Sequence, residues 1–398
     1  MQNENLERLK RQLFDSELLS ESRFDEIVAA CPPAVAENAA ELLAWLRTQG
    51  WLGEFQLEAL AAGVSGPFRL GPYRVDERIA AGRLGSVFRA VHVDFDQAVS
   101  LKIFSAALAD DPTQLARMQR EVRIAAQLEH PHVVRSFHVG RAGKAFFLAF
   151  EDLAGESLQS RIERQGRLPY AEACRLVRHA ALALEHLHEA EIIHRDLRPA
   201  NLWIDGQEQL KVIDFGAARD ALAFLDHTDG DRELTRQGTL LGDYAYSAPE
   251  AAFDARKADW RSDVYALGCV LYQALAGQPP FVHKNPMKVA QAHALETPRP
   301  LSLLAPDVPA ALEDLARRLL AKEPDQRPTV AEVDWNLQRY VADSDLAMPA
   351  ARQTWNPAYL AWIEELNAGQ PLEIEPAART GLSEDMTDFL DWLATMKG

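Results

Sequence analysis

The spacing of apolar residues changes twice along this chain, and this constrains its fold more than any other feature. Near the start, Leu6, Leu9 and Leu13 recur every three or four residues, which predicts helices. From about residue 70 to 152 the apolar runs are short, rich in β-branched and aromatic residues and bounded by turn residues, which predicts strands. Between about residues 157 and 340 helical spacing returns. A strand-rich unit followed by a larger helical unit predicts an α+β chain with two lobes.

The runs YRVDERIAAG, GSVFRAVHV, AVSLKIF and AFFLAF are the predicted strands of the first lobe, with one helix at about 112–128. In the second lobe the clearest helices are predicted at 171–190, 260–276 and 310–321. The only strands predicted there are two short ones, around NLWID and LKVID.

Both ends of the chain carry helical segments outside these lobes. Residues 1–66 predict four short helices, the third at 34–49 and the fourth at 53–62, followed by the Gly/Pro-rich segment GVSGPFRLGP. After residue 341, two helical patches, AYLAWIEEL and EDMTDFLDWLATM, lie in an acidic tail. The predicted division is therefore an N-terminal helical module, an N-lobe, a C-lobe and an acidic, partly helical tail: residues 1–66, 67–152, 153–340 and 341–398.

The acidic tail is unusually rich in aromatic residues for a segment of its charge. We expect these rings to dock on a neighbouring surface, because they would otherwise expose a large apolar area to water. The residues concerned are Trp355, Trp362, Phe389 and Trp392.

Composition excludes several classes of protein. A net charge of −17 argues against binding to nucleic acid or to an anionic membrane through bulk electrostatics. Cys31, Cys174 and Cys269 are far apart and form no CxxC pair, which excludes a disulfide framework and a cysteine zinc site and fits a reducing cytoplasm. No apolar run approaches the ~18 residues that a membrane span needs. We therefore expect a cytoplasmic protein with no membrane span and no nucleic-acid partner.

Five short elements with chemical potential occur in a fixed order. A Gly-containing turn, IAAGRLGSV at 79–87, lies between two predicted strands, and VSLK places Lys102 on the next strand. Glu121 lies in the helix that follows. The segment HRDLRPAN at 194–201 comes next, and DFG at 214–216 follows a short strand. Each element alone is weak, but all five in this order are specific.

In this order the elements resemble the eukaryotic-like serine/threonine protein kinases of bacteria, over about residues 70–335. HPHVV at 130–134 and YSAPE at 246–250 also match that family. The segment RSDVYALGC matches a helix that the family anchors through an aspartate, here Asp263, and Arg327 matches an arginine expected to pair with Glu250. The resemblance implies a bilobal protein-kinase fold with an antiparallel-sheet N-lobe and a helical C-lobe, preceded by a small helical bundle.

Other nucleotide-binding families fit less well. The Gly-containing turn leads into a strand and not into a helix, which excludes a dinucleotide dehydrogenase, and no GxxxxGK[ST] loop is present. Small-molecule kinases with a related core lack the element that holds Glu250, so the expected pair with Arg327 favours a protein kinase.

The resemblance implies ATP and Mg²⁺ as cofactors and gives each motif a role in phosphoryl transfer. Lys102 would bind the α/β-phosphates, with Glu121 orienting its ammonium group, and Asn201 and Asp214 would hold the magnesium. Asp196 would accept or orient the proton of the substrate hydroxyl. The nucleotide itself would meet backbone groups of the turn and hinge and apolar walls, at Gly82, Gly85, Glu151, Leu153, Ile79 and Val87.

Three residues depart from the family pattern. Ala80 replaces the first glycine of the turn, which is tolerable if its φ stays negative. Arg198 stands where the family has a lysine that contacts the γ-phosphate, and Asp243 stands where it has a threonine. We hypothesise that Arg198 and Asp243 form a compensating ion pair, because a second carboxylate near Asp196 would otherwise disturb its charge.

Two functions remain open from the sequence. One is an active kinase for Ser/Thr hydroxyls of proteins, including Thr235 or Thr239 of its own activation segment, where a phosphate could bind Arg195. The other is a pseudokinase that signals by conformation as a nucleotide-binding or scaffold module. The presence of every group needed for phosphoryl transfer favours activity. Protein substrates are the expected partners, and the N-terminal helical module could recruit another.

Overall fold

The computed structural model describes residues 2–16, 18–19, 21–49, 51–61, 68–82, 85–104, 128–142, 145–213, 244–254, 257–342, 346, 355–368 and 373–374. The chain divides into two compact units. The first comprises Met1–Arg123, Ser136–Asp152 and Thr354–Gly398, and the second comprises Ile124–Arg135 and Leu153–Gln353. The first unit thus contains the N-terminal helices, the main sheet and the described tail residues from 355 onward.

The N-terminal helices are α1 (Gln2–Asp15), α2 (Glu21–Ala30), α3 (Pro33–Ala36), α4 (Ala39–Thr48) and α5 (Glu54–Ala61). The stretch 34–49, expected as one helix, is divided between α3 and α4. Asn38 lies between them in an extended conformation, and its side chain accepts hydrogen bonds from the amides of Ala40 and Glu41, so it caps a new helix. Leu13, Leu42 and Leu46 are fully buried in the core of this bundle.

The main sheet contains, among the described residues, seven strands in the order β1-β2-β3-β4-β6-β5-β10. The pairs from β1 to β5 are antiparallel, and the short β10 lies parallel to β5. Sequence patterns missed β1, β5 and β10. The strands are β1 (Arg69–Leu70), β2 (Tyr73–Gly82), β3 (Gly85–His92), β4 (Gln97–Phe104), β5 (Ser136–Ala142), β6 (Ala145–Glu151) and β10 (Glu373–Ile374).

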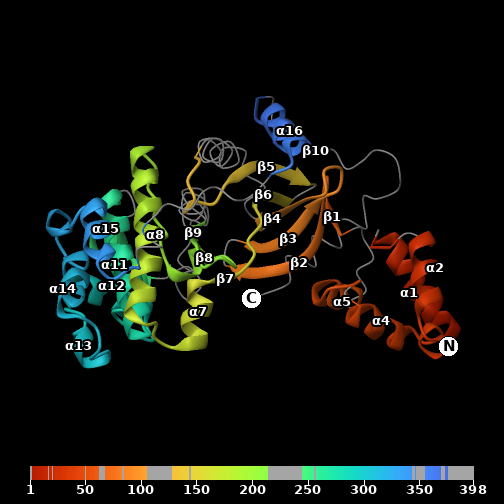
Figure 1. Ribbon diagram of the computed structural model, residues 1–398, viewed down its shortest axis with the longest axis horizontal. Coiled ribbons are helices and arrows are strands. Elements are labelled where there is room, and N and C mark those ends of the chain that lie inside the picture. The colour runs from red at the N-terminus through yellow and green to blue at the C-terminus, as the bar shows by residue number, and fades with distance from the viewer. Residues whose placement is uncertain are drawn as a thin grey trace, which may run out of the picture. The chain divides into compact units, whose positions relative to one another are not determined.

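One face of this sheet is buried under segments from both ends of the chain. Phe88, Leu101 and Ala149 are register partners, so their side chains share this face, and each is at most 1% exposed. Phe55 of α5 packs on Phe88, with ring centroids 5.3 Å apart. The tail helix α16 (Pro357–Ala368) lies beside β5 and adds Tyr359 to the same apolar cluster (Figure 1).

The tail helix is also joined to the sheet by polar contacts. The Tyr73 hydroxyl lies 2.7 Å from Nε2 of His138 and 3.1 Å from the Tyr359 hydroxyl, and all three side chains are buried. Trp355 and Trp362 pack against the apolar cluster, which confirms their expected docking. The other two aromatic residues of the tail, Phe389 and Trp392, lie outside the described residues.

The second unit is mainly helical. Its central helix α11 (Trp260–Ala276) is buried along most of its length and packs on α8 (Tyr170–Glu189) and α14 (Ala310–Leu319). These three helices match the predicted ones to within two residues. The other helices in its described residues are α7 (Leu158–Gln165), α10 (Pro249–Phe253), α12 (Pro286–Leu295), α13 (Leu301–Leu304) and α15 (Val330–Gln338), with 3₁₀ turns η2 (Pro199–Asn201), η4 (Tyr244–Tyr246) and η6 (Pro324–Gln326).

A small antiparallel sheet runs through the second unit, with three strands in the part of the chain described. The predicted strands around NLWID and LKVID are β8 (Leu202–Ile204) and β9 (Leu210–Val212), which form a hairpin. The third strand, β7 (Glu156–Ser157), is too short for sequence patterns to find and pairs with β8. The hairpin matters for function because it directly follows the HRDLRPAN segment.

Candidate active site

Lys102 lies on β4 in the first unit, on the face opposite to the one that α5 and α16 cover. Its register partners are Val87 on β3 and Leu148 on β6, whereas its neighbours Leu101 and Ile103 point into the apolar cluster. Lys102 is 7% exposed. Because successive side chains point to opposite faces of a strand, the Lys102 side chain leaves the sheet on the face away from the apolar cluster.

The Gly-containing turn is the end of the β2–β3 hairpin. Gly82 and Gly85 are register partners at that end, and residues 83–84 lie outside the described part. Ala80 is not among the described non-glycine residues with positive φ, so the condition for tolerating its methyl group is met. Ile79 and Val87 are partly exposed on β2 and β3.

The expected hinge follows β6. Glu151 ends this strand, pairs with Val99 and is 3% exposed. Leu153 comes two residues later, is 2% exposed and belongs to the second unit. Glu121, the expected partner of Lys102, lies outside the described residues.

The HRDLRPAN segment forms a loop that ends in the 3₁₀ turn η2. Pro199 begins this turn, as its fixed φ favours, and the amide of Asn201 donates to the carbonyl of Arg198 at 2.9 Å. The side-chain nitrogen of Asn201 donates to the Asp196 carbonyl at 2.8 Å and to its Oδ2 at 3.0 Å. The structure therefore brings Asp196 and Asn201 together, with Arg198 between them in the chain.

Asp263 fixes this loop from the start of α11. Its carboxylate, which is 1% exposed, accepts hydrogen bonds from the amides of His194 and Arg195, both at 2.8 Å. Arg195 has φ +65°, a left-handed conformation that costs free energy in a residue other than glycine. The two hydrogen bonds to Asp263 hold the backbone in this conformation beside Asp196. The expected role of Asp263 as an anchor is confirmed.

Sequence analysis missed a third partner of Asp263. Nε2 of His188, near the end of α8, lies 2.9 Å from its Oδ2. His188 lies in no sequence motif. Its position in the last turn of the helix predicted at 171–190 is the only sequence feature that could have suggested a role for it.

The loop is also joined to the strand that precedes the DFG motif. The amide of Ile213 donates to the Asn201 carbonyl at 3.0 Å, and Nε2 of His194 lies 3.1 Å from the Ile213 carbonyl. Asp214 follows Ile213 directly but lies outside the described residues, as do Thr235, Thr239 and Asp243. The proposed pair of Arg198 and Asp243 stays a prediction.

The expected pair of Glu250 and Arg327 is confirmed. Both terminal nitrogens of Arg327 donate to the carboxylate, at 2.7 and 2.8 Å, and the arginine side chain is fully buried. Ser262 donates a further hydrogen bond at 2.7 Å. Burial alone would raise the pKa of Glu250, but these hydrogen bonds outweigh it and hold the pKa below its ordinary value. The pair ties the APE turn to α11 and to the loop before α15.

Two features are absent from the described residues. No group of three or more His, Cys, Asp and Glu side chains there is arranged to hold a metal ion. In the same part of the chain, no helix is both long and apolar enough to cross a bilayer.

Comparison with known proteins agrees with this geometry. The sequence model of the protein kinase domain family matches residues 73–336 of this chain. Serine/threonine-protein kinase pkn3 of Myxococcus xanthus is 37% identical over 325 residues, which cover 79% of this chain and 58% of the relative. Serine/threonine-protein kinase PknB of Mycolicibacterium smegmatis is 36% identical over 272 residues, which cover 67% of this chain and 42% of the relative. The chain thus spans about half the length of the curated relatives it matches.

Solved structures give the same fold. The crystal structure of the PknI kinase domain of Mycobacterium tuberculosis matches with a TM-score of 0.53 at 25% identity, covering 68% of this chain and 97% of that one. The matched span 73–336 contains Lys102, the loop of Asp196 and Asn201, and the pair of Glu250 and Arg327. The chain therefore belongs to the protein kinase family.

Proposed function

We propose that this protein transfers the γ-phosphoryl group of ATP to Ser/Thr hydroxyls of proteins, in a reaction that needs Mg²⁺. The observation that carries this proposal is the hydrogen-bonded pair of Asp196 and Asn201, in a loop fixed by the buried Asp263. The relatives pkn3 and PknB are named serine/threonine-protein kinases, which supports hydroxyls of serine and threonine as the acceptors.

The side chain of Asn201 is suited to bind a magnesium ion. The nitrogen of the Asn201 amide donates to Asp196, so the atom left for a ligand is its carbonyl oxygen. Carboxylate and carbonyl oxygens are the ligands that Mg²⁺ prefers. We propose that Asn201 and Asp214 hold the ion, which would neutralise negative charge on the transferring phosphoryl group.

The other residues would bind and orient the reactants. Lys102 would bind the α/β-phosphates as a fixed positive charge, with Glu121 as its partner, and Arg198 would contact the γ-phosphate. Backbone amides near Gly82 and Gly85 would also approach the phosphates, because glycine has no side chain to keep them apart. Asp196 would accept a hydrogen bond from the substrate hydroxyl and take its proton as the new bond forms.

The side chains of Ile79 and Val87 would pack on the adenine ring. Backbone groups of the hinge residues Glu151 and Leu153 would hydrogen-bond its edge. We further propose that the activation segment is one of the substrates, at Thr235 or Thr239, and that other proteins are the remaining substrates.

A test of nucleotide binding uses Lys102→Met, which keeps the length and burial of the side chain but removes its charge. A charge-assisted hydrogen bond contributes about 1.5–3 kcal/mol, so ATP affinity in the presence of Mg²⁺ should fall about tenfold or more. Autophosphorylation should be lost. Isothermal titration and phosphate incorporation measure the two effects, and if neither changes, the proposed role of Lys102 is wrong.

A further inference from the structure

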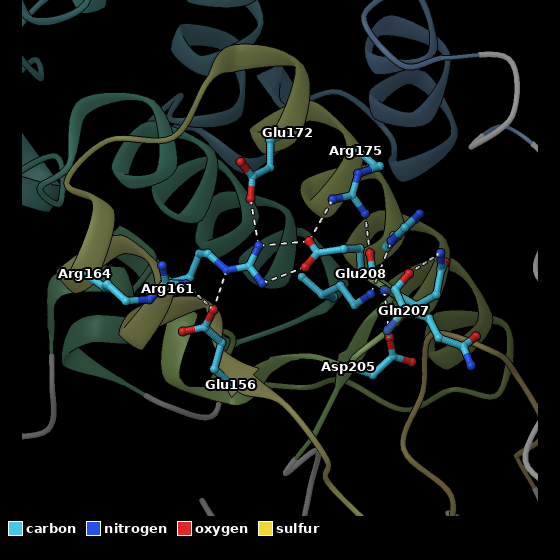
Figure 2. A network of polar contacts seen from close by, with 11 residues as sticks. Glu156, Arg161, Arg164, Glu172, Arg175, Asp205, Gln207 and Glu208 are labelled. Atoms are coloured by element: carbon cyan, nitrogen blue, oxygen red, sulfur yellow. Dashed lines mark hydrogen bonds and ion pairs between the residues drawn. The ribbon is translucent and has the colours of Figure 1, made fainter.

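Arg161, on α7 of the second unit, is bound by three carboxylates although no sequence motif contains it. Its Nε donates to Glu156 at 2.6 Å and its Nη1 donates to Glu172 at 2.9 Å. The same Nη1 and Nη2 donate to the two carboxylate oxygens of Glu208, at 2.9 and 3.0 Å. Only 8% of Arg161 is exposed. Figure 2 shows its guanidinium group between the three glutamates.

These three carboxylates come from three separate elements. Glu156 lies on β7, Glu172 lies in the first turn of α8, and Glu208 lies in the turn between β8 and β9. A planar guanidinium group with five fixed donors can join three elements at once, which a lysine ammonium group cannot do with the same geometry. Arg161 therefore connects α7, β7, α8 and the tip of the β8–β9 hairpin.

The tip of the hairpin contains a residue in the left-handed backbone conformation. Glu208 has φ +61°, which is unfavourable for a residue with a side chain. Arg175 also binds Glu208, with its Nη2 3.3 Å from the carboxylate, and donates to the Glu208 carbonyl. Hydrogen bonds from Arg161 are the main reason that the pKa of Glu208 lies below its ordinary value. The turn itself is closed by Asp205, whose carboxylate accepts from the amides of Gln207 and Gln209.

The other end of the same hairpin carries the proposed magnesium ligand. Asn201 precedes β8 directly, and the amide of Ile213, just after β9, donates to the Asn201 carbonyl at 3.0 Å. Each strand has only three residues, so a shift of the tip would be transmitted to Asn201 with little loss. Helix α7 also packs directly on η2, the turn that ends in Asn201.

Close packing of β7 leaves the hairpin little freedom to adjust in another way. A side chain at Gly155, which has φ +126°, would come within 2.0 Å of the Ile204 carbonyl oxygen. β7 and β8 therefore approach one another closely beside Glu156. The contacts of Glu208 with Arg161 and Arg175 hold the tip against α7 and α8.

We infer that Arg161 is a positioning residue: through Glu208 and α7 it fixes the β8–β9 hairpin so that the side-chain oxygen of Asn201 is in place to bind magnesium. The inference rests on the proposed function, because it assumes that Asn201 is a magnesium ligand. It adds a determinant of magnesium affinity on a helix that contains none of the recognised motif residues.

The test is a magnesium titration of phosphate transfer at saturating ATP with the full chain. In Arg161→Ala, the Mg²⁺ concentration for half-maximal rate should rise at least about threefold; loss of a direct partner of a metal ligand typically costs 10–100-fold in affinity. Arg161→Lys should recover only part of this, because it keeps the charge but not the planar set of donors. Arg164→Ala is the matched control, since Arg164 also binds Glu156 from α7 but makes no hydrogen bond or ion pair with Glu208 within the described part of the chain.

A purely structural role would lower the melting temperature of Arg161→Ala and leave its magnesium dependence equal to that of the wild type, and this result would overturn the inference. If Arg161→Ala does not fold, Glu208→Gln removes the charge at the hairpin tip without emptying a buried position, and the same shift is expected. If the Mg²⁺ concentration for half-maximal rate of Glu208→Gln equals that of the wild type, the inference is overturned as well. A wild-type protein without magnesium-dependent transfer would refute the proposed function instead, so the two failures are distinguishable.

Discussion

At the scale of single residues, the best-defined contact is the one between Arg327 and Glu250. The arginine side chain is fully buried and the glutamate side chain is 17% exposed, so neither charge is screened well by water. Such a pair contributes little relative to a well-packed apolar pair, but the loss of one partner leaves an uncompensated charge. The resemblance to kinases was enough to predict this pair, because both residues lie in short motifs, YSAPE and DQRP.

Arg327→Ala should therefore lower the free energy of unfolding by about 3–5 kcal/mol at pH 7. Glu250→Gln should also be destabilising, because it leaves the buried cation of Arg327 without its counter-ion. Urea unfolding at pH 7 measures both. Since the folded-state pKa of Glu250 is below its ordinary value, the contribution of the pair is present above about pH 4.5 and is lost as the pH falls through the folded pKa. Equal stability of Arg327→Ala and the wild type would contradict this.

The pair of Arg198 and Asp243 is a second prediction at this scale. If the arginine binds the aspartate and keeps it from Asp196, Asp243→Thr should cost less activity than Arg198→Ala. The two losses should also be non-additive in a double-mutant cycle of phosphate incorporation. Additive losses would show that the two residues act independently.

At the scale of elements, the tail helix α16 is part of the packing of the main sheet. The sequence predicts the helix and the docking of its tryptophans, because AYLAWIEEL has helical spacing and too many aromatic residues to stay exposed. It does not predict where they dock. The hydroxyl group of Tyr359 is hydrogen-bonded to that of Tyr73, which lies 286 residues earlier in the chain. No local pattern in either segment specifies a contact over such a distance in sequence.

Tyr359→Phe should lower the free energy of unfolding by about 1 kcal/mol, because it removes one buried hydrogen bond and keeps the ring. Tyr359→Ala should cost about 3–5 kcal/mol, as other large aromatic residues do when they are truncated in a core. Glu364→Ala, on an exposed position of the same helix, is the control and should change little. Equal melting temperatures for Tyr359→Ala and this control would show that α16 does not stabilise the sheet.

The short strands show a limit of sequence patterns at the same scale. β2, β3, β4 and β6 were predicted, because each has a long run of β-branched or aromatic residues. β5 reads SFHVGRA, and its histidine and glycine interrupt the run of β-branched and aromatic residues that would predict a strand. β1, β7 and β10 have only two residues each, which is too short for such a pattern. Arg161 escaped notice for a similar reason, since its three partners are brought together only by the fold.

At the scale of the whole molecule, buried histidines should set the response to mild acid. Burial lowers the pKa of His132 and His138 to about 4 and that of His179 to about 2. His132 and His179 stack with ring centroids 4.1 Å apart, and His138 lies under the tail helix beside Tyr73. Both compact units therefore contain histidines that stay neutral when the unfolded chain becomes protonated.

Stability should therefore fall as the pH drops below about 6.5, the usual pKa of histidine in an unfolded chain. Below that value the unfolded state binds protons that the folded state does not, and between pH 6.5 and 5 each such histidine lowers the free energy of unfolding by about 2 kcal/mol. The carboxylates lose their contributions to the free energy of unfolding only at lower pH. The decrease between pH 6.5 and 5 is therefore due to the histidines. Urea midpoints at pH 7, 6 and 5 should decrease steadily, and a constant midpoint would contradict the neutral, buried state of these side chains.

Transfer from labelled ATP by the full chain is the most direct measurement of the proposed phosphoryl transfer to serine or threonine by Asp196 and its loop. The wild type should incorporate label on serine or threonine with Mg²⁺ and lose it when the metal is chelated. Asp196→Asn, which keeps the size of the side chain, should be slower by about 10² or more, as expected for loss of a general base. Equal labelling of the two proteins, or a wild type that binds ATP and transfers nothing, would contradict the account.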